Sequence, residues 1–382
     1  MKKLIVISGV LLLVLPAMAA DWAFTGSMRM ATWFRDRNFG NEHTANSTFP
    51  GYPNSNDEGI TWYEQGNSRF DARVKEGAVA GRVEFGFGSA GDGSDQTVTT
   101  RLAYGTWRFA DNATLKIGKD DTPITTIISN QAWNDDQDLF AIGNFWGGRV
   151  PQIGLSLADL ELALLSVSYG SELGNTSKGI NGATGGNPNS YIPRIEANYT
   201  FRFDAGYIRP FGGFQWYEVQ STKTGNITGD LDVYSWALGL TTTWNIGDFS
   251  LSAQASYGMN EGNVPAWTQG FPNGRSIGAA YLKGGDNLAD TYTLQAAFVP
   301  AWAVTDWLRF ETGFGYRRDN PDGAPGYSKP VDVKTLYLQG MITFAPGVYL
   351  VPEIGYIDFD HNIAGYSQGN VWYAGAKWQI DF

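Results

Sequence analysis

The sequence contains no cysteine, and only two of its 382 residues are histidines. Without cysteine there is no disulfide framework, no thioether attachment of haem and no thiolate metal site. The histidines, His43 and His361, both fall in expected loops, and no serine on an expected strand stands at a spacing that suggests a nucleophile and its base. We therefore expect no enzymatic activity, no cofactor and no metal site.

Long apolar runs are also scarce. The longest, residues 4–15, follows Lys2 and Lys3 and precedes the small residues Ala17-Met18-Ala19. It is too short for a membrane-spanning helix, which takes about 20 residues. A basic start, an apolar stretch and a small-residue site are typical of a secretory signal peptide. We expect residues 1–20 to be that signal, cleaved after about Ala19, and residues 21–382 to form one domain.

Basic residues are outnumbered, with 27 Lys and Arg against 38 Asp and Glu. Nucleic-acid binding needs a basic footprint, so we expect no nucleic-acid partner. Aromatic residues make up 14% of the chain and glycine contributes 48 residues. Such a composition suits a β-barrel with one face toward lipid and the other toward water.

Residues 369–382 show the clearest membrane-type alternation. One face carries aromatic residues at both ends with small residues between them: Phe382, Ile380, Trp378, Ala376, Ala374 and Trp372. The other face includes Asp381, Gln379 and Lys377. A period of two indicates a β-strand. Aromatic residues at both ends are typical of a strand that crosses a bilayer, because these side chains favour the two interfaces.

Residues 68–75 alternate even more sharply. Phe70, Ala72 and Val74 share one face, while the opposite face carries four ionisable groups: Arg69, Asp71, Arg73 and Lys75. Placing these groups in a dry core would cost several kcal/mol each. That face is therefore expected to line water.

Sixteen such segments occur, joined alternately by eight long polar loops and seven short turns, with the turns on the side that holds both termini. This pattern predicts an all-β fold, a transmembrane antiparallel β-barrel with short periplasmic turns and long external loops. Closure leaves no unpaired strand edge in lipid. At this strand number the lumen is too wide for side chains to fill, so it holds water.

Two stretches depart from simple alternation. In the fourth segment, residues 99–109, Arg101 and Arg108 fall on opposite faces. We expect Trp107 and Phe109 to point outward and Arg101 to point inward. The longest stretch without alternation is residues 120–148, which forms the third long loop.

With its segments laid out, the chain resembles the general trimeric porins of Gram-negative outer membranes, the outer-membrane homotrimeric porin group. Three features carry the likeness: residues 65–70 (QGNSRF), residues 115–119 (LKIGK) and the strand that ends in Phe382. The resemblance implies a third loop that folds into the barrel and a homotrimer. It also implies that acidic loop residues face a ladder of basic residues. The loop lacks the Pro-Glu-Phe-Gly type of element found in such porins, so the resemblance does not fix which loop residues reach the constriction.

The residues that match this scheme are few. The basic residues expected to line the pore are Arg29, Arg69, Arg73, Arg82 and Arg101. The acidic residues of the constriction loop are Asp135, Asp136 and Asp138. Together they would impose a transverse field on the pore; the alternative is a loop face that is simply solvated. For Phe382 the resemblance implies a signal for barrel assembly, and the alternative is an ordinary lipid-facing anchor.

The resulting prediction is an outer-membrane porin of a Gram-negative bacterium that lets ions and small hydrophilic solutes diffuse passively. The expected partners are outer-membrane lipid and lipopolysaccharide, the barrel-assembly machinery, two further copies of the chain and the solutes themselves. Two alternatives remain: a channel specific for a sugar, an organic acid or a peptide, and a purely structural or adhesive barrel.

Overall fold

A computed structural model describes residues 20–38, 57–88, 97–136, 139, 142–169, 180–222, 225–268, 278–361, 364–365 and 367–382. Residues 1–19 of the expected signal peptide, His43 and Asp138 lie outside the described residues. No helix in the described ranges has the length and apolar character needed to cross a membrane.

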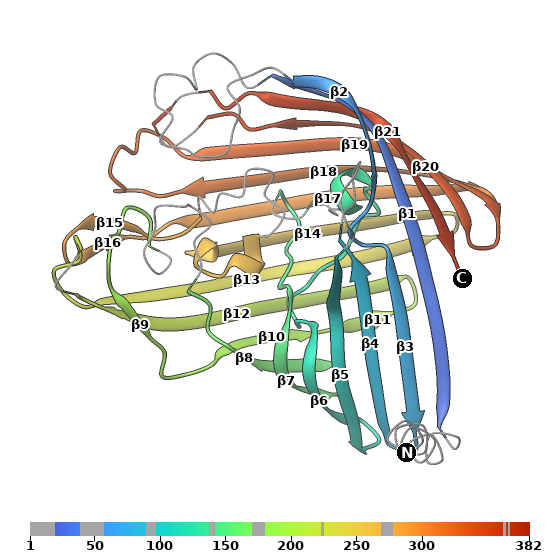
Figure 1. The fold of residues 1–382 in the computed structure, drawn as a ribbon, viewed down its shortest axis with the longest axis horizontal. Helices are drawn as coiled ribbons and strands as arrows, with labels where there is room; N and C mark the ends of the chain where they lie inside the picture. Colours follow the sequence, from blue (N-terminus) through green and yellow to red (C-terminus); the bar gives the residue numbers. More distant parts are fainter. Residues whose placement is uncertain are drawn as a thin grey trace, which may run out of the picture.

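The described chain forms a closed antiparallel β-barrel, and β21 pairs with β1 to complete it (Figure 1). Nineteen strands belong to its sheet. They make sixteen crossings (19 − 3), because β2 and β3 both pair with β1, β10 and β11 both pair with β12, and β9 is a short extension on β12. The predicted sixteen-stranded barrel is confirmed.

The strands of the wall are β1 (Asp21–Asn38), β2 (Asp57–Glu64), β3 (Arg69–Glu76), β4 (Val79–Phe87), β5 (Val98–Ala110), β6 (Ala113–Asp121), β7 (Arg149–Leu157), β8 (Leu160–Leu165), β9 (Asn187–Asn189), β10 (Arg194–Tyr199), β11 (Phe201–Phe203), β12 (Gly206–Gln220), β13 (Leu231–Ile246), β14 (Phe249–Met259), β17 (Tyr292–Thr305), β18 (Leu308–Asn320), β19 (Val331–Ala345), β20 (Val348–Asp358) and β21 (Asn370–Asp381). The loops contribute α2 (Trp133–Asp136), the 3-10 helices η3 (Glu261–Asn263) and η4 (Pro265–Thr268), and the hairpin of β15 (Tyr281–Gly284) with β16 (Asn287–Ala289).

Short turns and long loops lie at opposite ends of the barrel. The short turns each have two residues, at 77–78, 111–112, 158–159, 204–205, 247–248, 306–307 and 346–347. In Figure 1, β1 begins and β21 ends at the right of the view, whereas β15 and β16 lie at the left among the long loops. The predicted asymmetry of turns and loops is confirmed.

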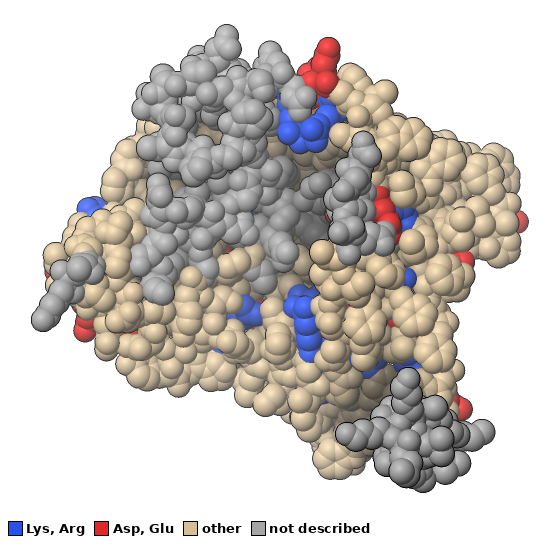
Figure 2. All heavy atoms as spheres, viewed as in Figure 1, with Lys and Arg blue, Asp and Glu red and all other residues tan. Residues whose placement is uncertain are grey.

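The outer face of the wall is apolar. On β21, Trp372, Trp378 and Ile380 are 47–54% exposed, while the inward Tyr373 and Lys377 are nearly covered. Most of the described surface in Figure 2 belongs to uncharged residues, and Lys, Arg, Asp and Glu occupy small areas. In water such a surface would be an aggregation hazard, whereas in a bilayer it meets lipid.

The second wall strand begins earlier than the alternation of residues 68–75 indicated. β2 pairs with the half of β1 that is nearer the long loops. Its Ile60 and Trp62 point out of the barrel and are 70% and 66% exposed. A turn, in which the Ser68 amide donates to the Gln65 carbonyl oxygen at 2.9 Å, separates β2 from β3. The strand expected at residues 68–75 is therefore preceded by β2, which starts at Asp57, because this turn interrupts the alternation that would have revealed it.

A β-bulge sets the direction of Arg101. Strict alternation would place Arg101 on the outer face with Trp107, yet Glu84 pairs with Leu102 while Phe85 pairs with Thr100. The extra residue reverses the facing of the strand beyond it. Arg101 Nε consequently reaches the inward carboxylate of Glu84 at 2.6 Å, and Trp107 remains 52% exposed outside.

Candidate functional site

The third long loop, L3 (residues 122–148), crosses the lumen. It leaves β6 and returns to β7, yet it reaches β14 and β18 on the far side of the barrel. Thr126 Oγ1 donates to Gln254 Oε1 at 2.6 Å, and the amide of Asn130 donates to Glu311 Oε1 at 2.6 Å. The predicted inward fold of this loop is confirmed, and L3 divides the lumen at the depth of these contacts.

Two buried wall carboxylates hold the crossing segment. Glu353 on β20 accepts the backbone amides of Ala132 at 2.5 Å and Trp133 at 3.2 Å, together with the Tyr373 hydroxyl at 2.8 Å. Glu311 on β18 also accepts the Asn130 side-chain amide at 2.7 Å. Such charge-assisted bonds are roughly twice as strong as neutral ones.

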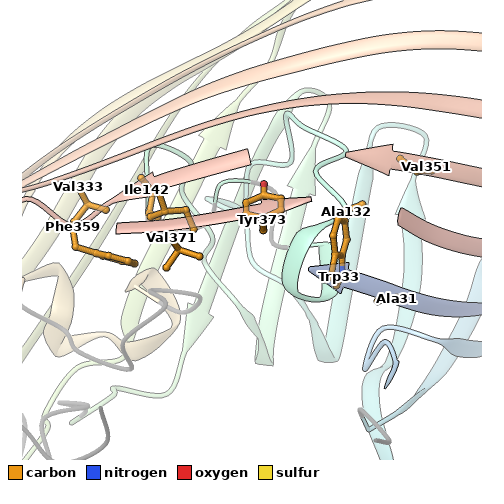
Figure 3. Packing of buried hydrophobic residues seen from close by; sticks show 10 residues of the cluster. Ala31, Trp33, Ala132, Ile142, Val333, Val351, Phe359, Val371 and Tyr373 are labelled. Carbon is orange, nitrogen blue, oxygen red and sulfur yellow. The ribbon is translucent and has the colours of Figure 1, made fainter. Parts of the chain in front are cut away.

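Aromatic packing supports the same anchor. The rings of Trp133 in α2 and Tyr373 in β21 stack at 4.1 Å between centroids, and Trp33 meets the Trp133 ring edge-on at 5.3 Å. Figure 3 shows Trp33, Ala132 and Tyr373 together beside the short helix. This apolar cluster excludes water from the joint between L3 and the wall, which strengthens the neighbouring hydrogen bonds.

Asp136 at the end of α2 is the loop carboxylate that meets wall cations. Its Oδ2 forms an ion pair with Arg29 on β1, and its Oδ1 lies 3.0 Å from Lys377 Nζ on β21. Asn67 Nδ2 donates to the same carboxylate at 2.7 Å and to the Asp135 backbone oxygen at 3.1 Å. Of the expected acidic residues, Asp135 therefore lies next to this contact and Asp138 falls outside the described residues.

The other expected basic residues pair mainly within their own wall. Arg73 and Arg82 both reach Asp71, at 2.8 and 2.7 Å. The Glu84 carboxylate forms ion pairs with Arg82, at 2.9 Å, and with Arg101. The charges on this wall thus alternate along β3–β5 instead of forming a purely basic ladder.

Arg69 is the exception on this wall. It is half-buried and points inward from β3, and no ion pair joins it to another described residue. Its guanidinium leaves donors available to a solute or to water. Within the described ranges, no group of three or more His, Asp or Glu side chains is placed to hold a metal ion.

A second loop also enters the lumen, which the sequence reasoning missed. In the described part of loop L6 (residues 260–268 and 278–291), Trp267 Nε1 donates to the buried Glu196 Oε1 on β10 at 2.9 Å. Trp267 packs with Ile124 and Phe145 of L3 and with Phe211 of β12 in one apolar cluster. The available sequence signal was a tryptophan within a loop. Its partners lie on separate strands and in L3, and they come together only when the barrel closes.

Phe382 completes the closure of the barrel at its turn end. The Gly26 amide donates to the Phe382 oxygen at 2.6 Å, and the Phe382 amide donates back to Gly26 at 3.0 Å. The Phe382 ring lies over Gly26 on the outer face, where a Cβ on Gly26 would come within 2.5 Å of it. The ring is 68% exposed, so it is available both to lipid and to a partner.

No protein-family model and no curated protein sequence matches the chain. Among solved structures, the outer membrane channel DcaP of Acinetobacter baumannii aligns with a TM-score of 0.69 and 15% identity, over 96% of this chain and 98% of that one. An anion-selective porin from Comamonas acidovorans aligns with a TM-score of 0.58 and 11% identity, over 95% and 100%. OmpT of Vibrio cholerae in its trimer form gives 0.53 and 14%, over 94% and 99%. The chain therefore has the fold of these outer-membrane channels and porins, as the resemblance in the sequence implied.

Proposed function

We propose that this protein is an outer-membrane porin, a water-filled channel through which ions and small hydrophilic solutes diffuse passively. The observation that carries the proposal is a closed sixteen-crossing barrel with an apolar outer face and inward charges such as Arg69 and Arg82. A barrel of this kind lets a sheet cross lipid without unpaired edges while it encloses water.

The constriction is formed where L3 meets the wall. Arg29, Arg69, Arg73, Arg82 and Arg101 line the pore on one side, and the acidic segment with Asp135, Asp136 and Asp138 belongs to the loop. The ion pair of Asp136 with Arg29 and its contact with Lys377 support this assignment. A permeating solute would meet fixed charges of both signs at close range, which orients dipolar molecules.

A channel selective for one class of small solute, such as a sugar, an organic acid or a peptide, is the second candidate. The presence of two loops in the lumen favours it, because L3 and L6 together leave less open cross-section than L3 alone. We assign no catalytic activity, since inward groups such as Arg82 and Arg101 are held in ion pairs and His361 lies beyond the end of β20.

The proposed assembly is a homotrimer in the outer membrane, surrounded by lipid and lipopolysaccharide and inserted by the barrel-assembly machinery. The trimer form of the Vibrio cholerae OmpT structure and the apolar outer wall support this part of the proposal.

Reconstitution into a planar lipid bilayer tests the function. The purified protein is expected to produce stepwise conductance, with three steps in each insertion event if the trimer inserts as a unit. A protein that dissolves as a compact monomer without detergent and leaks no ions through lipid vesicles would contradict both the barrel's membrane role and the channel.

A further inference from the structure

Ion pairs in opposite walls of the lumen differ sharply in exposure. On β10 and β18, Arg194 with Glu196 and Arg317 with Asp319 have side chains that are at most 2% exposed. On β3 and β4, the Arg73 side chain is 56% exposed and that of Arg82 is 25% exposed. All these groups point inward, but near the turn end of β18 the Arg309 side chain is 40% exposed. The dry part of the β10–β18 wall is therefore its loop end.

Loop L6 is the element that covers the dry wall. Glu261 Oε2 accepts Gln295 Nε2 of β17 at 2.9 Å, and Asn263 Nδ2 donates to the Tyr217 hydroxyl of β12 at 2.9 Å. The Trp267–Glu196 hydrogen bond adds a third attachment, to β10. L6 is thus fastened to its own strand β17 and to β12 and β10 on one side of its hairpin, which keeps it inside the barrel.

The joint between L6 and L3 leaves little room for water. Val264 and Trp267 of L6 pack on Ile124 and Phe145 of L3, and all four side chains are at most 1% exposed. A Cβ placed on Gly213 of β12 would stand 2.7 Å from the Trp267 ring. Close packing with apolar lining does not admit ordered water.

The opposite wall carries open space. A cavity of about 390 Å³ lies against β1, β3, β4 and β5, and its lining includes Arg82, Tyr104 and Thr106. A second cavity, of about 500 Å³, is lined by residues that include Arg69 and Arg73. Each is large enough to hold several water molecules, and its lining includes charged and polar side chains, so these cavities hold water. On the other wall, a cavity of about 380 Å³ lies at the turn end, against β17, β18 and β19.

We infer that L6 fills the loop end of the lumen on the β10–β18 side and that, at this depth, ions and solutes pass along the β3–β6 wall. The inference deepens the proposed porin function and rests on it for the passage of solutes. It identifies Arg69, Arg82 and the inward residues of β5 as the groups that a permeating solute meets. It also gives L6 the role of a plug joined to L3.

Thiol labelling tests the sidedness directly, because the natural chain has no cysteine. Thr106 on β5 and Thr241 on β13 are matched positions: both point inward at similar distances along their strands from a two-residue turn, but Thr241 is 0% exposed and Thr106 lines the open cavity. A cationic methanethiosulfonate reagent is expected to modify Thr106→Cys at least about tenfold faster than Thr241→Cys, because the reaction needs an accessible thiolate. Modification is expected to lower single-channel conductance only for Thr106→Cys.

Removal of the plug contact supplies the second test. Trp267→Ala in an Ala237→Cys background, where residue 237 of β13 is buried in the same cluster as Trp267, is expected to raise both the labelling rate at residue 237 and the conductance. The matched control is Trp302→Ala, which removes a tryptophan that is 56% exposed on the outer face. It is expected to change neither quantity.

Equal labelling of Thr106→Cys and Thr241→Cys in the otherwise unaltered protein would overturn the inference, as would a Trp267→Ala variant whose labelling matches that of the Trp302→Ala control. Absence of conductance in every variant, with the labelling contrast intact, would contradict the porin function but not the one-sided lumen.

Discussion

The Glu353 carboxylate on β20 accepts the backbone amide of Ala132 in L3 at 2.5 Å, although the two residues are 221 positions apart in the chain. Both are buried. The contact joins the crossing loop to the wall opposite its own strands. The shape of the lumen therefore depends on a side chain that the loop sequence does not contain.

Glu353→Gln is expected to loosen L3. The substitution replaces one acceptor oxygen by an amide group, so the buried donors Ala132 N, Trp133 N and the Tyr373 hydroxyl can no longer all be satisfied. Leaving a buried donor unpaired costs about 1–3 kcal/mol. A lower urea midpoint in detergent and noisier single-channel current are the expected readouts. Glu76→Gln, at an exposed position on β3, serves as the control, and equal behaviour of the two variants would contradict the anchoring role.

Asp136→Asn is expected to shift ion preference toward anions. The substitution removes the negative charge shared by Arg29 and Lys377, and two cations are then left without their carboxylate. The reversal potential across a bilayer with unequal KCl concentrations measures the shift. The combined substitution of Asp135, Asp136 and Asp138 by Asn tests the whole cluster.

The control for that experiment is Asp159→Asn, which removes an acidic residue from a short turn, where it pairs with Arg202. It is expected to leave the reversal potential unchanged. If the triple variant also keeps the conductance and selectivity of the unaltered protein, the acidic residues of L3 are a solvated loop face and do not set the field.

The barrel could be predicted from the sequence because the alternation along each strand indicates which residues face lipid and which face water. Residues such as Phe70 and Arg69 are neighbours in sequence but face lipid and water, so one strand reports both surfaces. Period-two patterning of this kind fixes strand number and facing without knowledge of any partner. The alternation failed at residues 65–68, where a turn splits one wall strand in two.

The contacts of the site could be predicted only in part. Asp136 was identified by its charge, whereas its partner Lys377 and the anchor Glu353 lie on strands at the other end of the chain. The inward position of Arg101 depends on a bulge that sequence alternation does not show. Loops have no periodicity, so the sequence does not show that Trp267 enters the lumen. Its partners come together only when the whole barrel closes.

Stability is expected to fall as pH rises from about 5 to about 8 because of Glu261 in η3. Burial, opposed by Arg317 and reinforced by Asp319, raises the pKa of Glu261 from 4.5 to about 8. In this range the folded protein keeps the proton that the unfolded chain releases. The stabilisation is therefore complete below the pKa of the carboxyl in the unfolded chain, 4.5, and is lost as pH rises past its pKa in the folded protein, about 8. Glu261→Gln is expected to flatten this dependence, measured as the rate of proteolytic cleavage within L6 between pH 5 and 9. An unchanged slope in that variant would exclude Glu261 as the cause.

Phe382→Ala separates barrel stability from barrel assembly. The two backbone hydrogen bonds between residue 382 and Gly26 do not need the ring, so the purified variant is expected to refold in detergent with little loss of stability. In cells, by contrast, loss of the exposed ring is expected to reduce the yield of inserted barrel several-fold if Phe382 is the signal that the assembly machinery reads. The matched control is Phe344→Ala, which removes another outward ring, 64% exposed and near the same end of the barrel. Equal yields from the two variants would leave Phe382 as a lipid-facing anchor, because any exposed aromatic ring at that interface contributes in the same way.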